Sequence, residues 1–360
     1  MLDRSGAYAE AVKKEFVLRK DTYSEYFKQQ QDVIKTIYFG GGTPSVIKKE
    51  DLLGILDLLI SEYKVDWSIE EITIEMNPSD VNIELLEAYK QGGINRLSIG
   101  IQTFHDDKLR FIGRRHNAQS AINAIDIAKQ VGFENISIDL MYGLPEETLD
   151  DWIEDVEKAI DCGVEHISAY CLSYEKGTPL FNALHNHEIL ETDENILIEM
   201  YDYAVERLEK AGIYLYEISN YAKKGYESKH NSGYWSGAAY IGLGAAAHSY
   251  NGKYTREWNV SDINKYISDV TLAYKKGSAQ YLPHEREWLS PSELYNETVM
   301  LRLRTTEGLK TEDISEKYLL HFERNAVKWL GKYMQYSDSR YSLTTDGRHI
   351  SNRIIEDLMI

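Results

Sequence analysis

Short apolar, β-branched runs alternate with helical patterns from residue 33 to about residue 220, and this alternation restricts the chain to few folds. The runs expected to form strands are 34–39, 71–76, 96–101, 135–140, 165–172 and 213–219. Between them, apolar residues recur at helical spacing most clearly in 51–63, 120–132 and 149–163, and several helical stretches end in glycine, at Gly132, Gly163 and Gly212. Successive strand–helix units predict a parallel sheet with right-handed crossovers, either open or closed into a barrel.

Unusual polar residues fall at the carboxyl ends of these expected strands. They are Gly40 to Thr43, Glu75, Asn77, Gln102, Asp139, Tyr170, Ser173, Glu217 and Asn220. The carboxyl ends of parallel strands meet at one rim, which is where such sheets bind ligands. The sequence therefore predicts a binding site at this rim.

Most of these features also have a purely structural explanation. The glycines 40–42 are compatible with a tight turn that needs positive φ, and Glu75 is placed to cap the following helix. Arg114 is typical of an exposed charge, and HNSGYW (230–235) is compatible with an ordinary turn carrying two core aromatic residues. Asp139 differs, because a carboxylate inside an apolar strand needs a partner or a ligand.

Composition excludes some classes of protein. The net charge is −18, from 58 acidic and 40 basic residues, which disfavours nucleic-acid binding. No apolar stretch approaches the roughly 20 residues of a membrane helix, and the N-terminus has no apolar signal-peptide region, so we expect a cytoplasmic protein. Cys162 and Cys171, nine residues apart, fit no common zinc or iron–sulfur spacing and are expected to be buried small side chains.

The pattern changes after residue 220. An aromatic, glycine-rich stretch covers 221–260, and the tail combines helices with a short strand in RYSLTTDGRHI, a turn at Asp346-Gly347 and a final helix. We therefore expect a barrel domain at 1–220, an aromatic and linking region at 221–284 and a small separate domain at 285–360.

Several motifs together resemble one family. TIYFGGGTPS, EITIEMNP, INRLSIGIQTF, IGRRHN, ISIDLMYGLP, YEISNYA, HNSGYW and YIGLGAAAHS are similar to the radical S-adenosylmethionine proteins related to oxygen-independent coproporphyrinogen III oxidase (HemN-like), and most of all to their heme-chaperone branch. LRLRTTEGL and LTTDGRHISNRIIEDL extend the resemblance into the tail. It implies an α/β fold, a partial (β/α) barrel of the radical SAM type, with a small C-terminal α+β, winged-helix-like domain.

The resemblance implies an S-adenosylmethionine (SAM) site. Carried over position by position, the SAM-contacting residues are Gly41, Gly42, Thr43, Glu75, Gln102, Arg114, Asp139 and Ser173. The residue types suit that ligand, because glycines let the backbone approach an amino acid, an arginine pairs with a carboxylate, and carboxylates bind an ammonium group or ribose hydroxyls.

The resemblance also implies a heme site. HNSGYW matches the H-N-x-x-Y-W motif of the heme-chaperone branch at His230, Asn231, Tyr234 and Trp235. His230 is the expected ligand of the heme iron, while Tyr234 and Trp235 are expected to lie against the macrocycle.

One family feature has no counterpart in this sequence. The family carries a C-x-x-x-C-x-x-C motif, which holds a [4Fe–4S] cluster, upstream of the segment that corresponds to residues 7–20. This sequence starts six residues before that segment, so we expect that it begins at an internal methionine and lacks the first barrel strand and the cluster cysteines. A cluster is expected for the family but not for this chain as written.

Three functions remain open from the sequence. The first is a heme chaperone that binds heme and SAM and delivers heme to hemoproteins, expected to be respiratory and membrane-associated. The second is the oxidase of porphyrin biosynthesis, which requires the cluster to reduce SAM. The third is a ligand-binding barrel without a redox role. No catalytic residue is assigned, and neither a nucleic-acid partner nor an integral membrane segment is expected.

Overall fold

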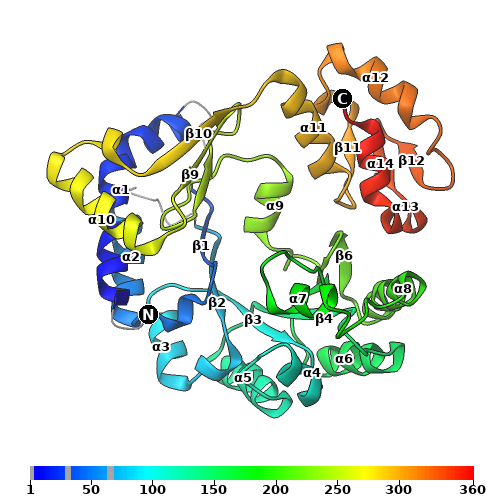
Figure 1. The fold of residues 1–360 in the computed structure, drawn as a ribbon, viewed down its shortest axis with the longest axis horizontal. Helices are drawn as coiled ribbons and strands as arrows, with labels where there is room; N and C mark the ends of the chain where they lie inside the picture. The colour runs from blue at the N-terminus through cyan, green and yellow to red at the C-terminus, as the bar shows by residue number, and fades with distance from the viewer. Residues whose placement is uncertain (1–3, 29–33, 63–68) are drawn as a thin grey trace. The chain divides into compact units, whose positions relative to one another are not determined.

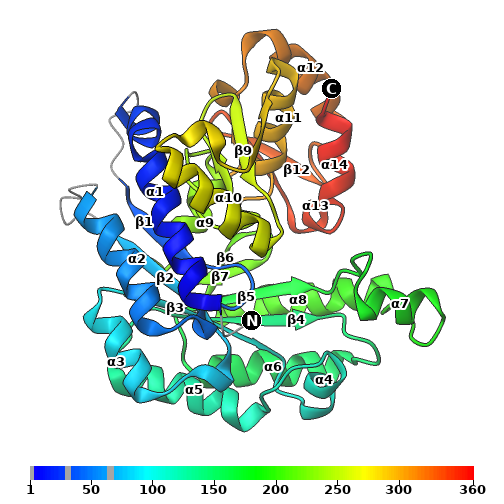
Figure 2. The same cartoon turned by 60° about the vertical axis from the view of Figure 1, so that its left-hand side comes forward.

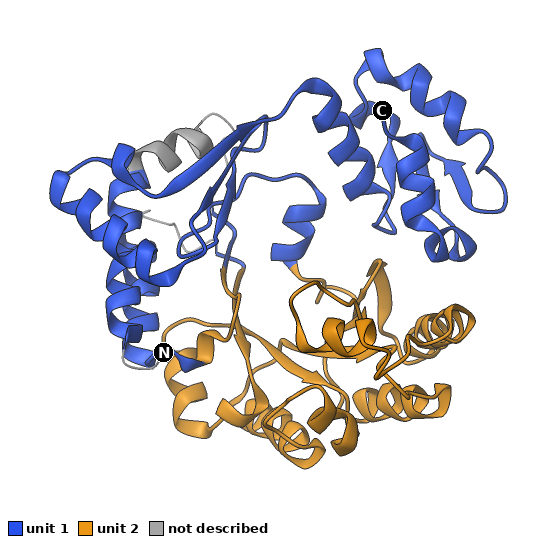
Figure 3. Ribbon diagram, viewed as in Figure 1, with its two compact units in different colours: residues 1–37, 46–70, 229–360 blue, residues 38–45, 71–228 orange. Residues whose placement is uncertain are grey.

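The computed structural model describes residues 4–28, 34–62 and 69–360. They form two compact units (Figure 3). Unit 1 comprises residues 1–37, 46–70 and 229–360, and unit 2 comprises residues 38–45 and 71–228. The first boundary falls within strand β1 (Thr36–Phe39). The three domains expected from the sequence remain a prediction.

Unit 2 is organised around a seven-stranded sheet of order β1-β2-β3-β4-β5-β7-β6. Its further strands are β2 (Glu71–Met76), β3 (Arg96–Gln102), β4 (Ile136–Tyr142), β5 (His166–Cys171), β6 (Tyr214–Glu217) and β7 (Asn220–Ala222). Neighbouring strands from β2 to β5 are parallel, whereas β7 is antiparallel to β5 and to β6. The predicted partial barrel is confirmed, and β7 is an addition that the sequence pattern did not predict.

Helices of unit 2 follow the strands as predicted. They are α3 (Ile83–Gln91), α4 (Asp106–Phe111), α5 (Ala118–Val131), α6 (Leu149–Asp161), α7 (Pro179–His185) and α8 (Glu194–Lys210). Helices α3, α5 and α6 cover one face of the sheet (Figures 1 and 2). Helix α6 begins at a Thr148–Asp151 capping box, and α5 ends at Gly132, whose φ is +90°. These boundaries confirm the predicted helices 120–132 and 149–163 to within two residues.

Apolar side chains from the strands and helices form the core of unit 2. Ile74, Leu97 and Ile138 occur on successive parallel strands and are fully buried. The indole of Trp152 on α6 is also fully buried, and its Nε1–H donates to the carbonyl of Met200 on α8 at 2.8 Å. Burying this donor without a partner would be costly, so the bond fixes how α6 packs on α8.

Unit 1 contains a three-stranded antiparallel sheet of order β10-β9-β8. Its strands are β8 (His248–Tyr250), β9 (Thr255–Asn259) and β10 (His284–Trp288), and its helices include α1 (Ser5–Lys28), α2 (Lys49–Glu62), α9 (Lys229–Trp235) and α10 (Ile263–Lys276). Helix α1 contacts both α2 and α10. The predicted helix 51–63 corresponds to α2, except for residue 63, which lies outside the described residues.

The C-terminal part of unit 1 has the α+β character that the sequence predicts. Its elements are α11 (Pro291–Arg302), β11 (Leu309–Lys310), α12 (Glu316–Ala326), β12 (Met334–Ser337), β13 (Arg340–Leu343), α13 (Thr345–His349) and α14 (Ser351–Leu358), with sheet order β11-β13-β12. Val299, Phe322 and Ile354 meet in one buried cluster. The predicted turn at Asp346-Gly347 is wrong: both residues belong to α13, because the Thr344 hydroxyl accepts from the Gly347 N–H at 3.1 Å and caps a helix there.

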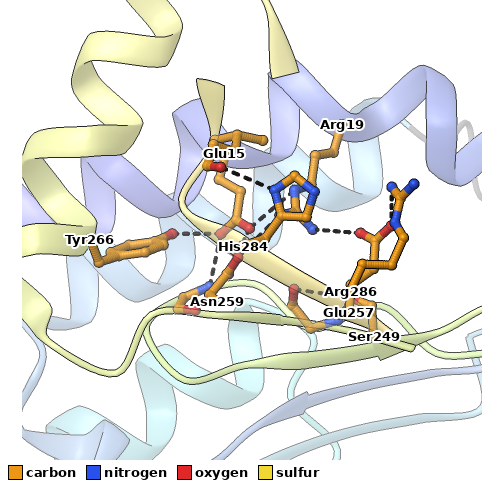
Figure 4. Close-up of polar contacts among 11 residues, drawn as sticks. Glu15, Arg19, Ser249, Glu257, Asn259, Tyr266, His284 and Arg286 are labelled. Carbon is orange, nitrogen blue, oxygen red and sulfur yellow. Dashed lines mark hydrogen bonds and ion pairs between the residues drawn. The ribbon is translucent and has the colours of Figure 1, made fainter. Parts of the chain in front are cut away.

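A buried carboxylate joins several elements of unit 1 (Figure 4). Glu15 on α1 is fully buried and accepts from the Tyr266 hydroxyl at 2.6 Å, the Asn259 amide at 2.7 Å and the Gly244 N–H at 3.0 Å. The Arg19 guanidinium lies 3.4 Å from the same carboxylate and also reaches Glu257 on β9 at 3.5 Å. These bonds compensate the desolvation of the charges and connect α1 to β9 and α10.

Replacing Glu15 with alanine should lower the free energy of unfolding by about 3 kcal/mol, because three donors and Arg19 would lose a buried partner. The measurement is urea denaturation followed by circular dichroism. Glu10→Ala is the matched control on the same helix, since Glu10 is exposed and its pair with Lys13, at 3.0 Å, is a surface pair. Its loss should stay within about 0.5 kcal/mol. Equal losses in the two variants would contradict a special role for Glu15.

Candidate functional site

Glycine is required at the three positions after β1 for two different reasons. A Cβ at Gly40 would lie 2.3 Å from the ring of Tyr38 and 2.8 Å from the carboxylate of Glu75. Gly41 and Gly42 have φ of +78° and +71°, and a Cβ on either would meet nothing within 4 Å. Packing therefore requires glycine at 40, whereas the left-handed backbone favours it at 41 and 42. The explanation by a tight turn with positive φ is therefore correct for Gly41 and Gly42. At Gly40, the groups that leave no room for a side chain are those of Tyr38 and Glu75.

Glu75 holds this loop. Its carboxylate accepts from the Tyr38 hydroxyl at 2.7 Å and from the Gly41 N–H at 3.1 Å. Burial and the nearby charge of Glu75 raise the pKa of Tyr38, so the phenol remains a donor. The cap of the following turn is Asn77, whose side chain accepts from the Ser79 N–H at 3.0 Å. The role of helix cap that the sequence left open for Glu75 thus belongs to Asn77.

Gly40→Ala should disrupt the loop, because the new methyl group would displace Tyr38 from Glu75. We expect a loss of about 1–3 kcal/mol of unfolding free energy. Gly42→Ala meets no atom and should cost about 1–2 kcal/mol from backbone strain alone. The distinguishing measurement is urea denaturation of both variants with and without a second change, Tyr38→Phe, which removes the hydroxyl bonded to Glu75. The loss from Gly40→Ala should shrink in the Tyr38→Phe background and the loss from Gly42→Ala should not, and equal losses from Gly40→Ala in the two backgrounds would contradict the assignment.

A cavity of about 130 Å³ lies at the carboxyl ends of β2, β3 and β4. Its lining includes Gly42, Thr43, Glu75, Gln102, Arg114 and Asp139, which are six of the eight predicted SAM-contacting residues. Gly41 joins this group through its bond to Glu75. Ser173 does not: it is exposed and bonded to Glu175 at 3.2 Å. The volume is below the 300–1,000 Å³ usual for a whole organic ligand, so the cavity fits one end of SAM.

Arg114 brings a partly buried cation to this cavity. Its Nη2 donates to the carbonyl of Gly100 at 2.6 Å, and its Nε is buried without a hydrogen-bond partner among the described residues. Desolvation lowers the pKa of Arg114, and the charge of Asp139 opposes that shift. Gln102 beside it has φ of +76°, a conformation that non-glycine residues rarely adopt. An unpaired buried guanidinium donor suits a carboxylate ligand.

Asp139 brings a carboxyl group with a raised pKa to the same cavity. Burial raises its pKa to about 6, and the charge of Glu75 acts in the same direction. Hydrogen bonds from Ser168 and Ser98 partly offset this rise, the second at 3.3 Å. Two carboxylates and one guanidinium in a single cavity match the ammonium and carboxylate groups of an amino acid. The residues present therefore fit the methionine end of SAM.

The raised pKa of Asp139 predicts a specific pH dependence. The folded protein holds this proton more tightly than the unfolded chain, so the contribution to stability is present below about pH 4 and is lost as pH rises through about 6. Relative to Asp139→Asn, the wild type should lose about 3 kcal/mol of unfolding free energy between pH 4 and pH 7. Urea denaturation of both proteins across this range measures it, and parallel pH profiles would contradict the prediction.

Sequence reasoning missed other parts of this cavity. Ser98 and Gly100 line it from β3, and Tyr38 supports Glu75 from β1. The available signal was a small or polar residue within an apolar strand, as in RLSIGI. That signal is weak, since small residues also occur in strands for packing reasons.

The predicted heme residues lie in unit 1, on α9. The Nδ1 of His230 lies 2.9 Å from the Thr36 hydroxyl, and its Nε2 lies 3.2 Å from the Tyr234 hydroxyl. The rings of His230 and Tyr234 are 4.9 Å apart and nearly perpendicular, and Tyr234 packs edge-on against Tyr240 at 4.8 Å. Both imidazole nitrogens are thus oriented by hydroxyl groups.

A second cavity, of about 350 Å³, lies beside α9. Tyr234 and Trp235 of the motif line it together with Tyr240 and Tyr250, whereas His230 and Asn231 do not. The alternative of an ordinary turn with two core aromatic residues is wrong for this motif: it is helical, Tyr234 is 41% exposed, and Trp235 is not fully buried. Tyr234 therefore contacts both the cavity and His230.

The described residues do not fit an iron–sulfur cluster. They contain no group of three or more His, Cys, Asp or Glu side chains placed to hold a metal ion. Both cysteines are free thiols, and burial raises the pKa of each. The prediction of two buried cysteines is wrong: Cys171 is exposed at the end of β5, and Cys162 is only partly buried.

A partial barrel with a glycine loop and a rim of polar side chains at the carboxyl ends of its strands is typical of a radical SAM protein. The family model described as the Radical SAM superfamily matches residues 6–159. Among solved structures, coproporphyrinogen III oxidase (HemN) from Escherichia coli shares the fold, with a TM-score of 0.80 and 19% identity, covering 100% of this chain and 84% of that chain.

The sequence relatives identify the branch of the radical SAM proteins to which this chain belongs. The heme chaperone HemW of Bacillus subtilis (strain 168) is 36% identical over 342 residues, which are 94% of this chain and 88% of that protein. HemW of Lactococcus lactis subsp. lactis (strain IL1403) is 30% identical over 341 residues, 93% of this chain and 87% of that protein. The chain belongs to the HemN-like radical SAM family, in its HemW branch.

Proposed function

We propose that this protein is a heme chaperone, which binds heme beside α9, binds SAM at the rim of the partial barrel, and delivers heme to hemoprotein acceptors. The observation that carries the proposal is the aromatic cavity whose wall includes Tyr234 and Trp235 of the H-N-x-x-Y-W motif. A flat apolar macrocycle is suited to such walls, since aromatic rings bury a large area and stack on other π-systems. The relatives from Bacillus subtilis and Lactococcus lactis are named as heme chaperones, which supports the proposal.

His230 is the proposed ligand of the heme iron. When its Nδ1–H donates to the Thr36 hydroxyl, its Nε2 carries the lone pair that binds a metal. In this tautomer the Tyr234 hydroxyl donates to the Nε2. Binding of heme would replace that hydrogen bond by the iron and turn Tyr234 toward the macrocycle, which the exposure of Tyr234 allows.

SAM is the second proposed ligand, bound through its amino-acid end. Arg114 would take the carboxylate, and Glu75 and Asp139 would take the ammonium group. SAM supplies a sulfonium-linked adenosyl group when it is bound. The residues of this chain orient its methionine end, with Gly42 and Thr43 forming the wall.

The same fold also carries coproporphyrinogen III oxidase, so the fold alone does not choose between the two activities. The cavity lined by Tyr234 and Trp235 of the H-N-x-x-Y-W motif favours the heme chaperone.

We further propose a cytoplasmic protein whose acceptors are respiratory, membrane-associated hemoproteins. None of the helices in the described ranges is both long enough and apolar enough to cross a membrane.

Titration with hemin tests the proposal. The wild type should show a shifted Soret band that saturates near one equivalent. His230→Ala should alter the band and weaken binding at least tenfold, because the iron loses its ligand. His185→Ala, which removes an exposed histidine of α7 in unit 2, is the control and should behave like the wild type.

Two outcomes would count against it. Absence of a saturable spectral change in the wild type would refute heme binding. A His230→Ala spectrum identical to that of the wild type would refute only the assignment of the ligand.

A further inference from the structure

The cavity beside α9 has an unusual charge for this protein. The chain carries a net charge of −18, yet three cations line the cavity against two carboxylates, Glu297 and Asp313. The cations are Lys253, Arg256 and Arg302. An excess of positive charge in an acidic protein, next to aromatic walls, indicates a ligand that is both aromatic and anionic.

Arg256 already interacts with other side chains of the protein. Its guanidinium forms an ion pair with Glu297 at 2.7 Å and a weaker one with Glu287 at 3.5 Å. It also lies 5.5 Å from the centre of the Tyr250 ring. Burial acts to lower the pKa of Arg256, but the bonds to Glu297 and to Tyr240 outweigh it and raise that pKa. Arg256 therefore shapes the cavity and contributes little capacity for a further anion.

Arg302 is different. Its Nη2 donates to the carbonyl of Ser236 at 3.2 Å, and its Nε lies 3.7 Å from Asp313. A guanidinium has five N–H donors, so these two contacts leave capacity for a ligand. Ser236 follows Trp235 directly, so this bond places the guanidinium at the end of the heme motif. The side chain is 26% exposed, which keeps it accessible from the cavity.

Asp313 is the group that a ligand carboxylate would compete with. It is itself only partly buried, and at 3.7 Å its pair with Arg302 is long. Long, partly exposed pairs of this kind contribute little, whereas two parallel bonds from a guanidinium to a carboxylate are stronger. Lys253 adds an exposed ammonium group on the turn between β8 and β9.

We infer that Arg302, assisted by Lys253, binds the propionate carboxylates of heme, so that the edge of the porphyrin that carries them faces α11 while the macrocycle lies against Tyr234 and Trp235. This inference rests on the proposed function and adds a specific anion subsite to it. The volume of about 350 Å³ lies at the lower end of the range for organic ligands. A porphyrin here would remain partly exposed, as suits a cargo that must be passed on.

The experiment compares two ligands that differ only in these carboxylates: hemin and iron(III) protoporphyrin IX dimethyl ester. The wild type should bind hemin roughly tenfold more tightly than the ester, and Arg302→Gln should lose most of that preference. Asp313→Asn should tighten hemin binding a few-fold by removing the competing carboxylate, without changing affinity for the ester. Arg304→Gln is the matched control, since Arg304 lies two residues away, bonds to Asn352 at 2.9 Å and does not line the cavity.

The ester separates a loss of the subsite from a loss of folding, because a misfolded variant would bind neither ligand. Equal affinity of the wild type for hemin and ester, or equal losses in Arg302→Gln and Arg304→Gln, would overturn this inference and leave the heme-binding proposal intact. Binding of neither ligand by the wild type would overturn both.

Discussion

The bond between Glu75 and the glycine loop is the interaction on which the rim of unit 2 depends. One carboxylate accepts from the Tyr38 hydroxyl and the Gly41 N–H, and so fixes the chain after β1 to the end of β2. Parallel strands then bring Gln102 and Asp139 to the same edge. Because each strand end is held by its neighbours, polar groups from distant parts of the sequence face one small cavity.

The two units use buried charge in different ways. In unit 1, the carboxylate of Glu15 accepts from three donors and pairs with Arg19, so its charge is compensated within the protein. In unit 2, Arg114 retains a buried Nε without a partner among the described residues, and burial raises the pKa of Asp139. The donors around Glu15 belong to the protein, whereas a buried donor at a cavity that lacks a partner among the described residues, such as the Nε of Arg114, indicates a ligand. This difference separates the structural network from the candidate site.

Much of the fold follows from the sequence, since the period of apolar residues determines which segments form strands and helices. Strand β2 begins and ends where EITIEM predicts, and β3 to β6 lie within two residues of their predicted ends. The failures are local. Strand β7 has three residues, too few for a period, and it exists because it pairs with β5 and β6. The Asp346-Gly347 pair forms a helix because a threonine caps it, which outweighs the turn preference of the two residues.

The candidate sites are less predictable, since they depend on which side chains meet. Family motifs gave most of the rim but placed Ser173 there, although it bonds to Glu175 instead. Arg302 lies 66 residues from its partner Ser236, and no local pattern indicates that pairing. Within α9, His230 and Tyr234 are four residues apart and therefore share one face. The tyrosine lines the cavity while the histidine does not, although the two side chains are in hydrogen-bond contact, and the motif alone does not reveal this difference.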